Sequence, residues 1–306
     1  MKYALIADVH ANLYALEAVL RDAAEQGAQK YIFLGDYCQG TPLYNETMQL
    51  LRSVSNAVFV SGNEDETAVQ MAAHETEITG QFISSYWFGK HIAPGHIAFL
   101  ASLPEELVVD DVIRAMHKPQ LHFEGLIPCE IEPLYYFKCM KAGTFTNETF
   151  PAYAAEQLAH DEAFHRRLDE LSAGIYVFGH THIQWHYEHG DKLLINPGSV
   201  GIPLAFDTRA AYTMLESTQG GWQVLQRQVD YDRESMLDAF DRSDYSRDVP
   251  VWSSVIRDEI ATAREHALLF LIYADEYAKS IGDDQRPYSH ETWHAAYELW
   301  KEHNMK

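Results

Sequence analysis

Short apolar runs alternate with helical periodicity over the first 60 residues. Residues 3–7, 31–34 and 57–60 are almost uniformly apolar, which is typical of strands buried on both faces. Between the first two runs, apolar residues recur at spacings of three and four, which predicts a helix over about residues 12–26. Thr41-Pro42 predicts the start of a second helix before the third strand. Strands separated by helices in this order indicate an α/β fold with helices on both faces of a sheet.

The middle of the chain mixes both periodicities. Residues 64–102 are mostly helical in pattern, and apolar runs on either side of Asp110-Asp111 predict a β-hairpin. Residues 119–153 look irregular and are rich in aromatic side chains, and a single helix is expected over about residues 154–171. Further strands are expected at residues 174–178, 183–189, 192–195, 211–215 and 222–228.

The pattern changes to helix from Tyr231 onward. An apolar stripe with spacings of four and three runs from Ile256 to Tyr277, and a shorter helix is expected from His290 to the end. We therefore expect a main domain over residues 1–230, with 119–153 as a candidate cap insertion, and a helical extension over 231–306.

Composition narrows the class of protein. The 306 residues carry 23 Lys+Arg against 45 Asp+Glu, a formal charge of −22, and 47% are hydrophobic, which excludes wholesale disorder. A surface with this much negative charge repels a nucleic-acid backbone, and we therefore do not expect a long nucleic acid as a partner. Cys38, Cys129 and Cys139 form no CxxC pair, which favours a reducing compartment. The longest apolar run, Ala267–Ala274, is far shorter than the ~18–20 residues that span a bilayer, and the first residues are too short for a signal peptide. We expect a cytoplasmic protein with no membrane partner.

Polar residues of metal-ligand type follow the expected strands. The carboxyl ends of parallel strands meet at one edge of a sheet, so side chains placed there converge. Asp, His and Asn offer the oxygen and nitrogen donors that divalent Mn, Fe or Zn accept. Each residue alone is weak evidence, because a strand-end Asp is commonly a helix cap and Gly-Asp is ordinary turn chemistry. The residues in these positions are Asp8, His10, Asp36, Asn63, His117, His180 and His182.

Taken in order, these motifs resemble the calcineurin-like metallophosphoesterase superfamily. The motifs that support this resemblance are Asp8-x-His10, Gly35-Asp36, Gly62-Asn63, His117 and Gly179-His-Thr-His182. Two further stretches, Asp8–Leu13 and Ile195–Gly201, are similar to its small bacterial phosphodiesterase branch. The resemblance covers about residues 1–230 and implies a four-layer α/β/β/α sandwich with two divalent metal ions (Mn, Fe or Zn) at one edge.

The resemblance also implies the ligand sets and the reaction. Asp8, His10, Asp36 and His182 would hold the first metal; Asp36 would bridge to the second, held also by Asn63, His117 and His180. Two cations ~3.5–4 Å apart share a hydroxide that attacks phosphorus in line, while the metals neutralise the phosphoryl oxygens. The expected substrates are phosphodiesters or phosphomonoesters of small molecules, nucleotide-type compounds among them.

The sequence departs from the family pattern at three positions. Glu64 stands where many relatives have a His that protonates the leaving oxygen, and with Asn63 it is a candidate catalytic residue. Acid catalysis by Glu64 requires a raised pKa of its carboxyl. The alternative is that Glu64 is a solvated residue at a helix start. Lys118 replaces a Gly and could contact a substrate phosphate or point to solvent. Leu204 stands where relatives often have an Arg. Asn12 could contact phosphate, although an N-cap role is favoured.

Other interpretations fit the sequence less well. The same fold also serves as a non-catalytic interaction scaffold, as in the retromer subunit that resembles this family; the absent motif His and the helical tail favour it, and the intact ligand set opposes it. A dinucleotide-binding domain lacks its Gly-x-Gly-x-x-Gly, and a serine hydrolase lacks its Gly-x-Ser-x-Gly. Tyr135 and Tyr136 could stack on a base above the metals, although aromatic residues more often serve packing.

Overall fold

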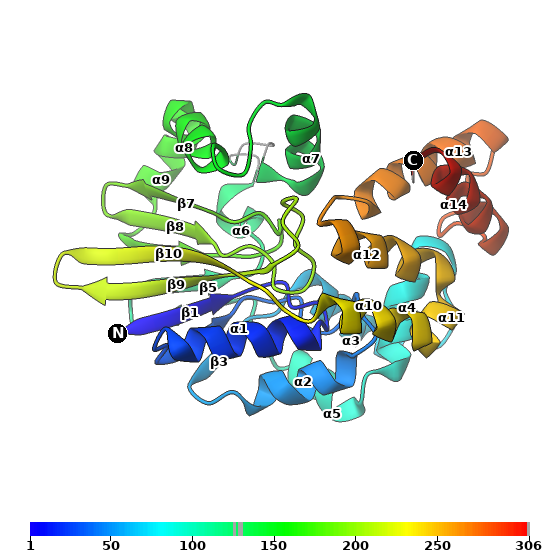
Figure 1. Ribbon diagram of the computed structural model, residues 1–306, viewed down its shortest axis with the longest axis horizontal. Coiled ribbons are helices and arrows are strands. Elements are labelled where there is room, and N and C mark those ends of the chain that lie inside the picture. The colour runs from blue at the N-terminus through cyan, green and yellow to red at the C-terminus, as the bar shows by residue number, and fades with distance from the viewer. Residues whose placement is uncertain (125–126, 128–130, 305–306) are drawn as a thin grey trace.

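The computed structural model describes residues 1–124, 127 and 131–304, and Cys129 lies outside them. Two five-stranded sheets face each other (Figure 1). The first has the order β10-β9-β1-β2-β3; β1, β2 and β3 are parallel, and β9 is antiparallel to both β1 and β10. Its strands are β1 (Lys2–Ile6), β2 (Lys30–Phe33), β3 (Ala57–Phe59), β9 (Ala210–Thr218) and β10 (Gly221–Val229).

The second sheet has the order β4-β5-β6-β8-β7. The hairpin expected around Asp110-Asp111 is confirmed, with β4 and β5 antiparallel, and β5, β6 and β8 run parallel. Its strands are β4 (Glu106–Val109), β5 (Ile113–Met116), β6 (Gly174–Val177), β7 (Trp185–His189) and β8 (Lys192–Asn196).

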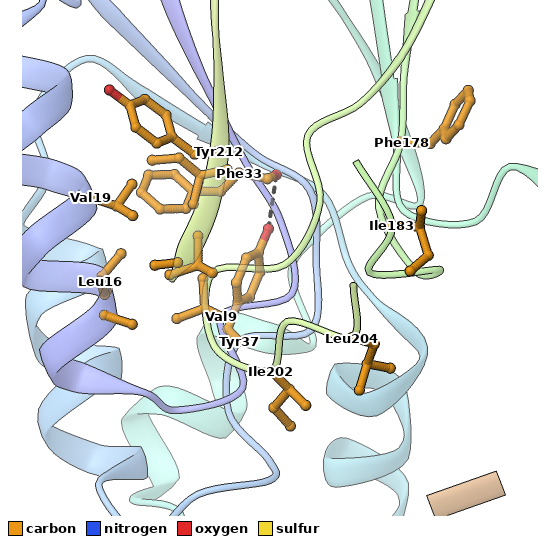
Figure 2. Close-up of a cluster of buried hydrophobic side chains, with 14 of the residues drawn as sticks. Val9, Leu16, Val19, Phe33, Tyr37, Phe178, Ile183, Ile202, Leu204 and Tyr212 are labelled. Carbon is orange, nitrogen blue, oxygen red and sulfur yellow. Dashed lines mark hydrogen bonds between the residues drawn. The ribbon is translucent and has the colours of Figure 1, made fainter. Parts of the chain in front are cut away.

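Alternation along the strands produces two cores. On β1, Tyr3 and Leu5 point into the cluster between the sheets, whereas Ala4 and Ile6 belong to the cluster under the helices. Figure 2 shows this outer cluster, in which the Tyr37 hydroxyl donates to the backbone carbonyl of its neighbour Phe33 at 2.9 Å. Both faces of β1 are buried, which explains why its residues are uniformly apolar. Two facing sheets with helices on their outer faces make four layers, so the expected α/β/β/α sandwich is confirmed.

Helices cover the outer faces of both sheets. α1 packs on β9 and β10, and α8 packs on β7 (Figure 1). The helices of the first half are α1 (Leu13–Glu25), α2 (Tyr44–Ser53), α3 (Asn63–Ala73), the 3-10 turn η1 (Gly80–Phe82), α4 (Ile83–His91) and α5 (Pro94–Leu100). Those before β6 are α6 (Gln120–Phe123), α7 (Pro133–Ala142), α8 (Phe150–His160) and α9 (Glu162–Glu170).

Three local expectations were wrong. The segment 119–153 contains α6 and α7 and is not irregular throughout. The single helix expected over 154–171 is two helices, because the Asp161 side chain accepts from Ala163 N and Phe164 N and so starts a new helix. The helix expected at Thr41-Pro42 begins at Tyr44.

In the part that the structure describes, the C-terminal extension consists of helices and the loops that connect them. Its stripe is divided between two helices by Ala263, which has a left-handed conformation with φ 52°. α12, α13 and α14 share a cluster of their own that includes Val255, Phe270 and Trp293, and α10 packs against α1. The helices are α10 (Arg233–Arg242), α11 (Asp244–Asp248), α12 (Pro250–Thr262), α13 (Ala267–Ile281) and α14 (His290–Asn304). Among the described residues, no helix is both long and apolar enough to cross a bilayer.

Candidate metal centre

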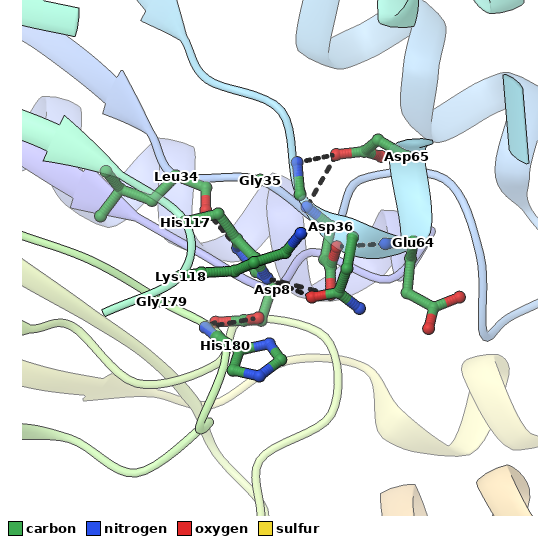
Figure 3. Close-up of polar contacts among 12 residues, drawn as sticks. Asp8, Leu34, Gly35, Asp36, Glu64, Asp65, His117, Lys118, Gly179 and His180 are labelled. Atoms are coloured by element: carbon green, nitrogen blue, oxygen red, sulfur yellow. Dashed lines mark hydrogen bonds and ion pairs between the residues drawn. The ribbon is translucent and has the colours of Figure 1, made fainter. Parts of the chain in front are cut away.

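The predicted ligands lie in loops at the carboxyl edges of both sheets. Asp8 and His10 follow β1, and Asp36 follows β2. From the facing sheet, His117 follows β5, and the loop after β6 carries His180 and His182. Asn63 is the first residue of α3, directly after the loop that ends β3. The site therefore lies on the seam between the two sheets (Figure 3).

The ligand atoms converge at short distances. Asp36 Oδ2 lies 3.3 Å from His117 Nε2 and 4.0 Å from His10 Nε2, so this carboxylate stands between two imidazoles, as a bridging ligand would. Asn63 Oδ1 lies 3.1 Å from His117 Nε2. Two three-residue groups have donor atoms within 4.8 Å of one another and share Asp8: Asp8 with His10 and His182, and Asp8 with Asp36 and His117.

Backbone carbonyls orient three of the imidazoles. The Nδ1 atoms of His10, His117 and His182 lie 3.2, 2.6 and 2.6 Å from the carbonyl oxygens of Gln39, Leu34 and Ile202. A carbonyl only accepts, so Nδ1 must be the donor, and in the neutral ring Nε2 keeps its lone pair. All three Nε2 atoms face the site, which is the arrangement that metal-binding imidazoles adopt.

The loops hold strained backbone conformations at the ligands. Positive φ values occur at Asp8 (53°), His10 (46°), Asp36 (56°), His180 (73°) and His182 (58°). Each costs of order 1–3 kcal/mol in a residue other than Gly, and such strain concentrates at functional sites. Gly62 permits the close approach, since a Cβ there would lie 2.1 Å from Asp36 Oδ1.

Three residues that sequence reasoning did not select hold these loops in place. Asp65, 1% exposed, accepts from the backbone N–H groups of Asp36, Tyr37 and Gly62 at 2.8–2.9 Å (Figure 3). Ser199 Oγ donates to the Asp8 carbonyl at 2.9 Å, and Asn196 Nδ2 donates to the Gly179 carbonyl at 2.8 Å. The spacing of Asp65 three residues after Gly62 is typical of a capping residue and could have pointed to it. Ser199 and Asn196 lie in the Ile195–Gly201 motif, but their partners are distant in sequence.

Burial controls the charge of the cluster. It lowers the pKa of His180 to about 4 and that of His182 to about 3, and it also lowers the pKa of His10, so these three rings are neutral and able to bind a cation. Burial also lowers the pKa of His117, but Asp36 and Asp8 outweigh it and raise that pKa to about 10. His117 is thus a cation beside Asp36, whose pKa it lowers against the effect of burial, while burial raises the pKa of Asp8 to about 8. A metal ion at this position would supply the positive charge instead. The donor set therefore fits divalent metal ions.

A comparison with protein families decides the classification. The model of the calcineurin-like phosphoesterase family matches residues 1–184, which is more than half of the chain. The chain belongs to the calcineurin-like phosphoesterase family. The family is metal-dependent, in agreement with the geometry of the centre.

Similar proteins extend the match toward the C-terminus. An uncharacterised protein of Methanocaldococcus jannaschii is 27% identical over 245 residues, 75% of this chain and 87% of its own length. A metallophosphoesterase structure from Sphaerobacter thermophilus has a TM-score of 0.59 at 22% identity and covers 86% of this chain and 99% of its own. A hypothetical protein of Pyrococcus horikoshii has a TM-score of 0.55 at 20% identity, with 78% and 92% covered. At this identity, the two structures show a shared fold.

Glu64 is neither fully solvated nor fully enclosed. Its side chain is half-buried and faces the cavity in front of the ligands, while its backbone N–H donates to Asp36 Oδ1 at 2.8 Å. Burial, Asp36 and Asp65 raise the pKa of Glu64 to about 8. Glu64 is the second residue of α3, as a helix-start residue would be, but its side chain is only partly solvated, so acid catalysis stays a prediction.

The remaining sequence predictions differ in outcome. Lys118 Nζ lies 3.2 Å from Glu66 Oε2 in an ion pair whose side chains are 36% and 34% exposed, and its contact with a substrate phosphate stays a prediction. Asn12 is fully buried; it caps α1 by accepting from Ala15 N and donates to the Gly201 carbonyl, which places it as a structural residue and not as a substrate contact. Tyr136 is 1% exposed and packs with Phe145 and Phe150, so it cannot stack on a base.

A cavity of about 560 Å³ opens in front of the candidate metal ligands. One wall carries His10, Asp36, Asn63, Glu64, His180 and His182. The facing wall comes from the C-terminal extension, through α12, α13 and the loop between them. The candidate cap segment contributes Glu132 and Pro133. The extension therefore covers the metal edge to a greater extent than the segment in which the sequence suggested a cap.

Proposed function

We propose that this phosphoesterase hydrolyses phosphodiester or phosphomonoester bonds of small molecules, nucleotides included, with two divalent metal ions (Mn, Fe or Zn) as cofactors. The observation that carries the proposal is the position of Asp36, whose carboxylate lies between the Nε2 atoms of His10 and His117 at 4.0 and 3.3 Å. A single carboxylate between two imidazole donors is suited to two cations rather than one.

The chain supplies the ligands and the surroundings of the reaction. When bound, two divalent cations would activate water and neutralise charge on the phosphoryl oxygens. Asp8 and Asp36 would provide the negative charge that holds them, and the oriented Nε2 atoms of the histidines and Asn63 Oδ1 would complete the sets. Glu64 lines the cavity next to Asn63, and we propose that its carboxyl donates a proton to the leaving oxygen.

The test is hydrolysis of bis(p-nitrophenyl) phosphate with added Mn²⁺ by the full-length protein and by Asp36→Asn. We expect metal-dependent turnover in the wild type and a loss of at least ~100-fold in the variant, since Asp36 contributes to both cations. Asp169→Asn is the matched control, because Asp169 is 71% exposed and lies on α9, remote from the centre. A folded, metal-loaded wild type without turnover on any phosphoester would instead support the interaction-scaffold interpretation.

A further inference from the structure

The wall opposite the metal ligands is largely apolar. The extension contributes Trp252, Ile256, Leu268 and Leu271, and Phe82 of η1 faces the same cavity. Leu268 is 41% exposed and Phe82 is 45% exposed, so both side chains are accessible to a molecule in the cavity. The organic group of a substrate whose phosphate sits at the metal ligands would extend along this wall.

The titratable groups on this side of the cavity are carboxyls, two from the extension and one from the candidate cap segment. Glu132, Glu259 and Glu265 line the cavity, and among the described lining residues there is no Lys or Arg. Glu259 cannot turn away, because its Oε1 accepts from His266 N and Ala267 N at 2.9 and 2.8 Å. A polyphosphate chain needs Arg or Lys partners for the phosphates that lie beyond the metals. Among the lining residues that the structure describes, the extension offers no such cation.

We infer that the C-terminal extension makes the site selective for esters of a single phosphate with an apolar alkyl or aryl group, and against nucleoside polyphosphates. This inference rests on the proposed phosphoesterase function. It assigns the extension a direct role: α12 and α13 form the part of the site that receives the alcohol group of the ester.

Binding of phosphonates tests the inference without requiring turnover. The Mn²⁺-loaded full-length protein is titrated calorimetrically with methyl-, butyl- and octylphosphonate and with 4-phosphonobutyrate, which carries one extra carboxylate. We expect the affinity to rise about twofold to fourfold for each buried methylene. The extra carboxylate should reduce the affinity at least ~10-fold relative to butylphosphonate, because it enters a wall without cationic partners.

Two substitutions on one helix form the matched pair. Leu268→Lys puts a cation on the cavity wall and should flatten the dependence on chain length while strengthening the binding of 4-phosphonobutyrate. Ile272→Lys is one turn away, 44% exposed and not among the lining residues, so it should leave all four affinities unchanged.

The outcomes separate the two proposals. Affinities that do not depend on chain length, absence of phosphonate binding, or equal effects of both lysine variants would overturn the inference. If neither p-nitrophenyl alkyl phosphates nor any other phosphodiester or phosphomonoester is hydrolysed while the phosphonate series behaves as expected, the proposed function fails and the selectivity of the cavity stands. If they are hydrolysed at rates independent of the alkyl group and phosphonate affinities are flat, the function stands and the inference fails.

Discussion

The three hydrogen bonds accepted by Asp65 should be necessary for metal binding, although Asp65 is not itself a ligand. Its Oδ2 accepts from Asp36 N and Gly62 N, and its Oδ1 accepts from Tyr37 N. These donors belong to the loop that carries Asp36 and to the turn before α3. In Asp65→Asn, one oxygen is retained and two of the three bonds can persist; in Asp65→Ala, all three donors lose their partner.

The expected magnitudes follow from that count. A buried donor left without a partner costs about 1–3 kcal/mol, so Asp65→Asn should lower the free energy of unfolding by about that amount. Asp65→Ala should lower it by about 3–9 kcal/mol before relaxation, which is comparable with the whole stability of a typical domain. Asp65→Asn is therefore the informative variant. Because it loosens the loop that carries Asp36, we expect Mn²⁺ affinity to fall ~10–100-fold, as for other residues that orient metal ligands.

Urea unfolding of the metal-free protein and calorimetric titration with Mn²⁺ measure the two effects separately. Asp161→Asn is the control, because Asp161 also accepts two backbone N–H bonds, from Ala163 and Phe164, but starts α9 away from the centre. It should change stability by up to about 1 kcal/mol and leave Mn²⁺ affinity unchanged. The reasoning is refuted if Asp65→Asn binds Mn²⁺ as tightly as the wild type, or if the control weakens binding equally.

Three further predictions concern single residues. Glu64→Gln should slow esters with poor leaving groups at least ~10-fold and spare nitrophenyl esters, since only poor leaving groups need a proton; equal losses in kcat on both would contradict its role. Gly62→Ala should abolish Mn²⁺ binding in titrations, because the new Cβ would lie 2.1 Å from Asp36 Oδ1, whereas Gly95→Ala has no atom within 4 Å of its Cβ and should bind normally. Burial and then Glu265 raise the pKa of Glu259 well above its ordinary 4.5, so the folded protein loses stability as the pH rises through the folded pKa. In urea titrations, Glu259→Gln should thus be more stable than the wild type at about pH 8, and this gain should disappear below about pH 4.5, where Glu259 is protonated in both states; a constant difference would contradict it.

Much of the fold and the converging ligands could be predicted from the sequence because both depend on local patterns. Uniformly apolar strands require cover on both faces, and a polar residue that follows a parallel strand is carried to the common edge. Asp36 and His117 were found in this way, and the structure brings them to 3.3 Å. The rule needs only the position of each residue relative to its own strand.

The missed features depend on contacts between distant segments. Nothing in the sequence around β9 indicates that it pairs antiparallel with β1, some 200 residues earlier. Likewise, the bond from Ser199 to the Asp8 carbonyl joins residues 191 positions apart. The position of α12 and α13 opposite the ligands depends on how the extension packs, which an amphipathic stripe does not specify. Such pairings follow from the packing of the whole chain.

The location of the ligands on the seam between the sheets has a consequence for metal exchange. Asp8, His10 and Asp36 come from one sheet, and His117, His180 and His182 come from the other. Neither half alone holds a complete set, so the site forms only when the two sheets have docked. A metal ion bound there joins the halves and opposes their separation, in proportion to its affinity. If a chelator is too large to reach the centre through the cavity, a bound metal ion can leave only when the two sheets separate. The rate of metal loss to such a chelator would then equal the rate at which the sandwich opens.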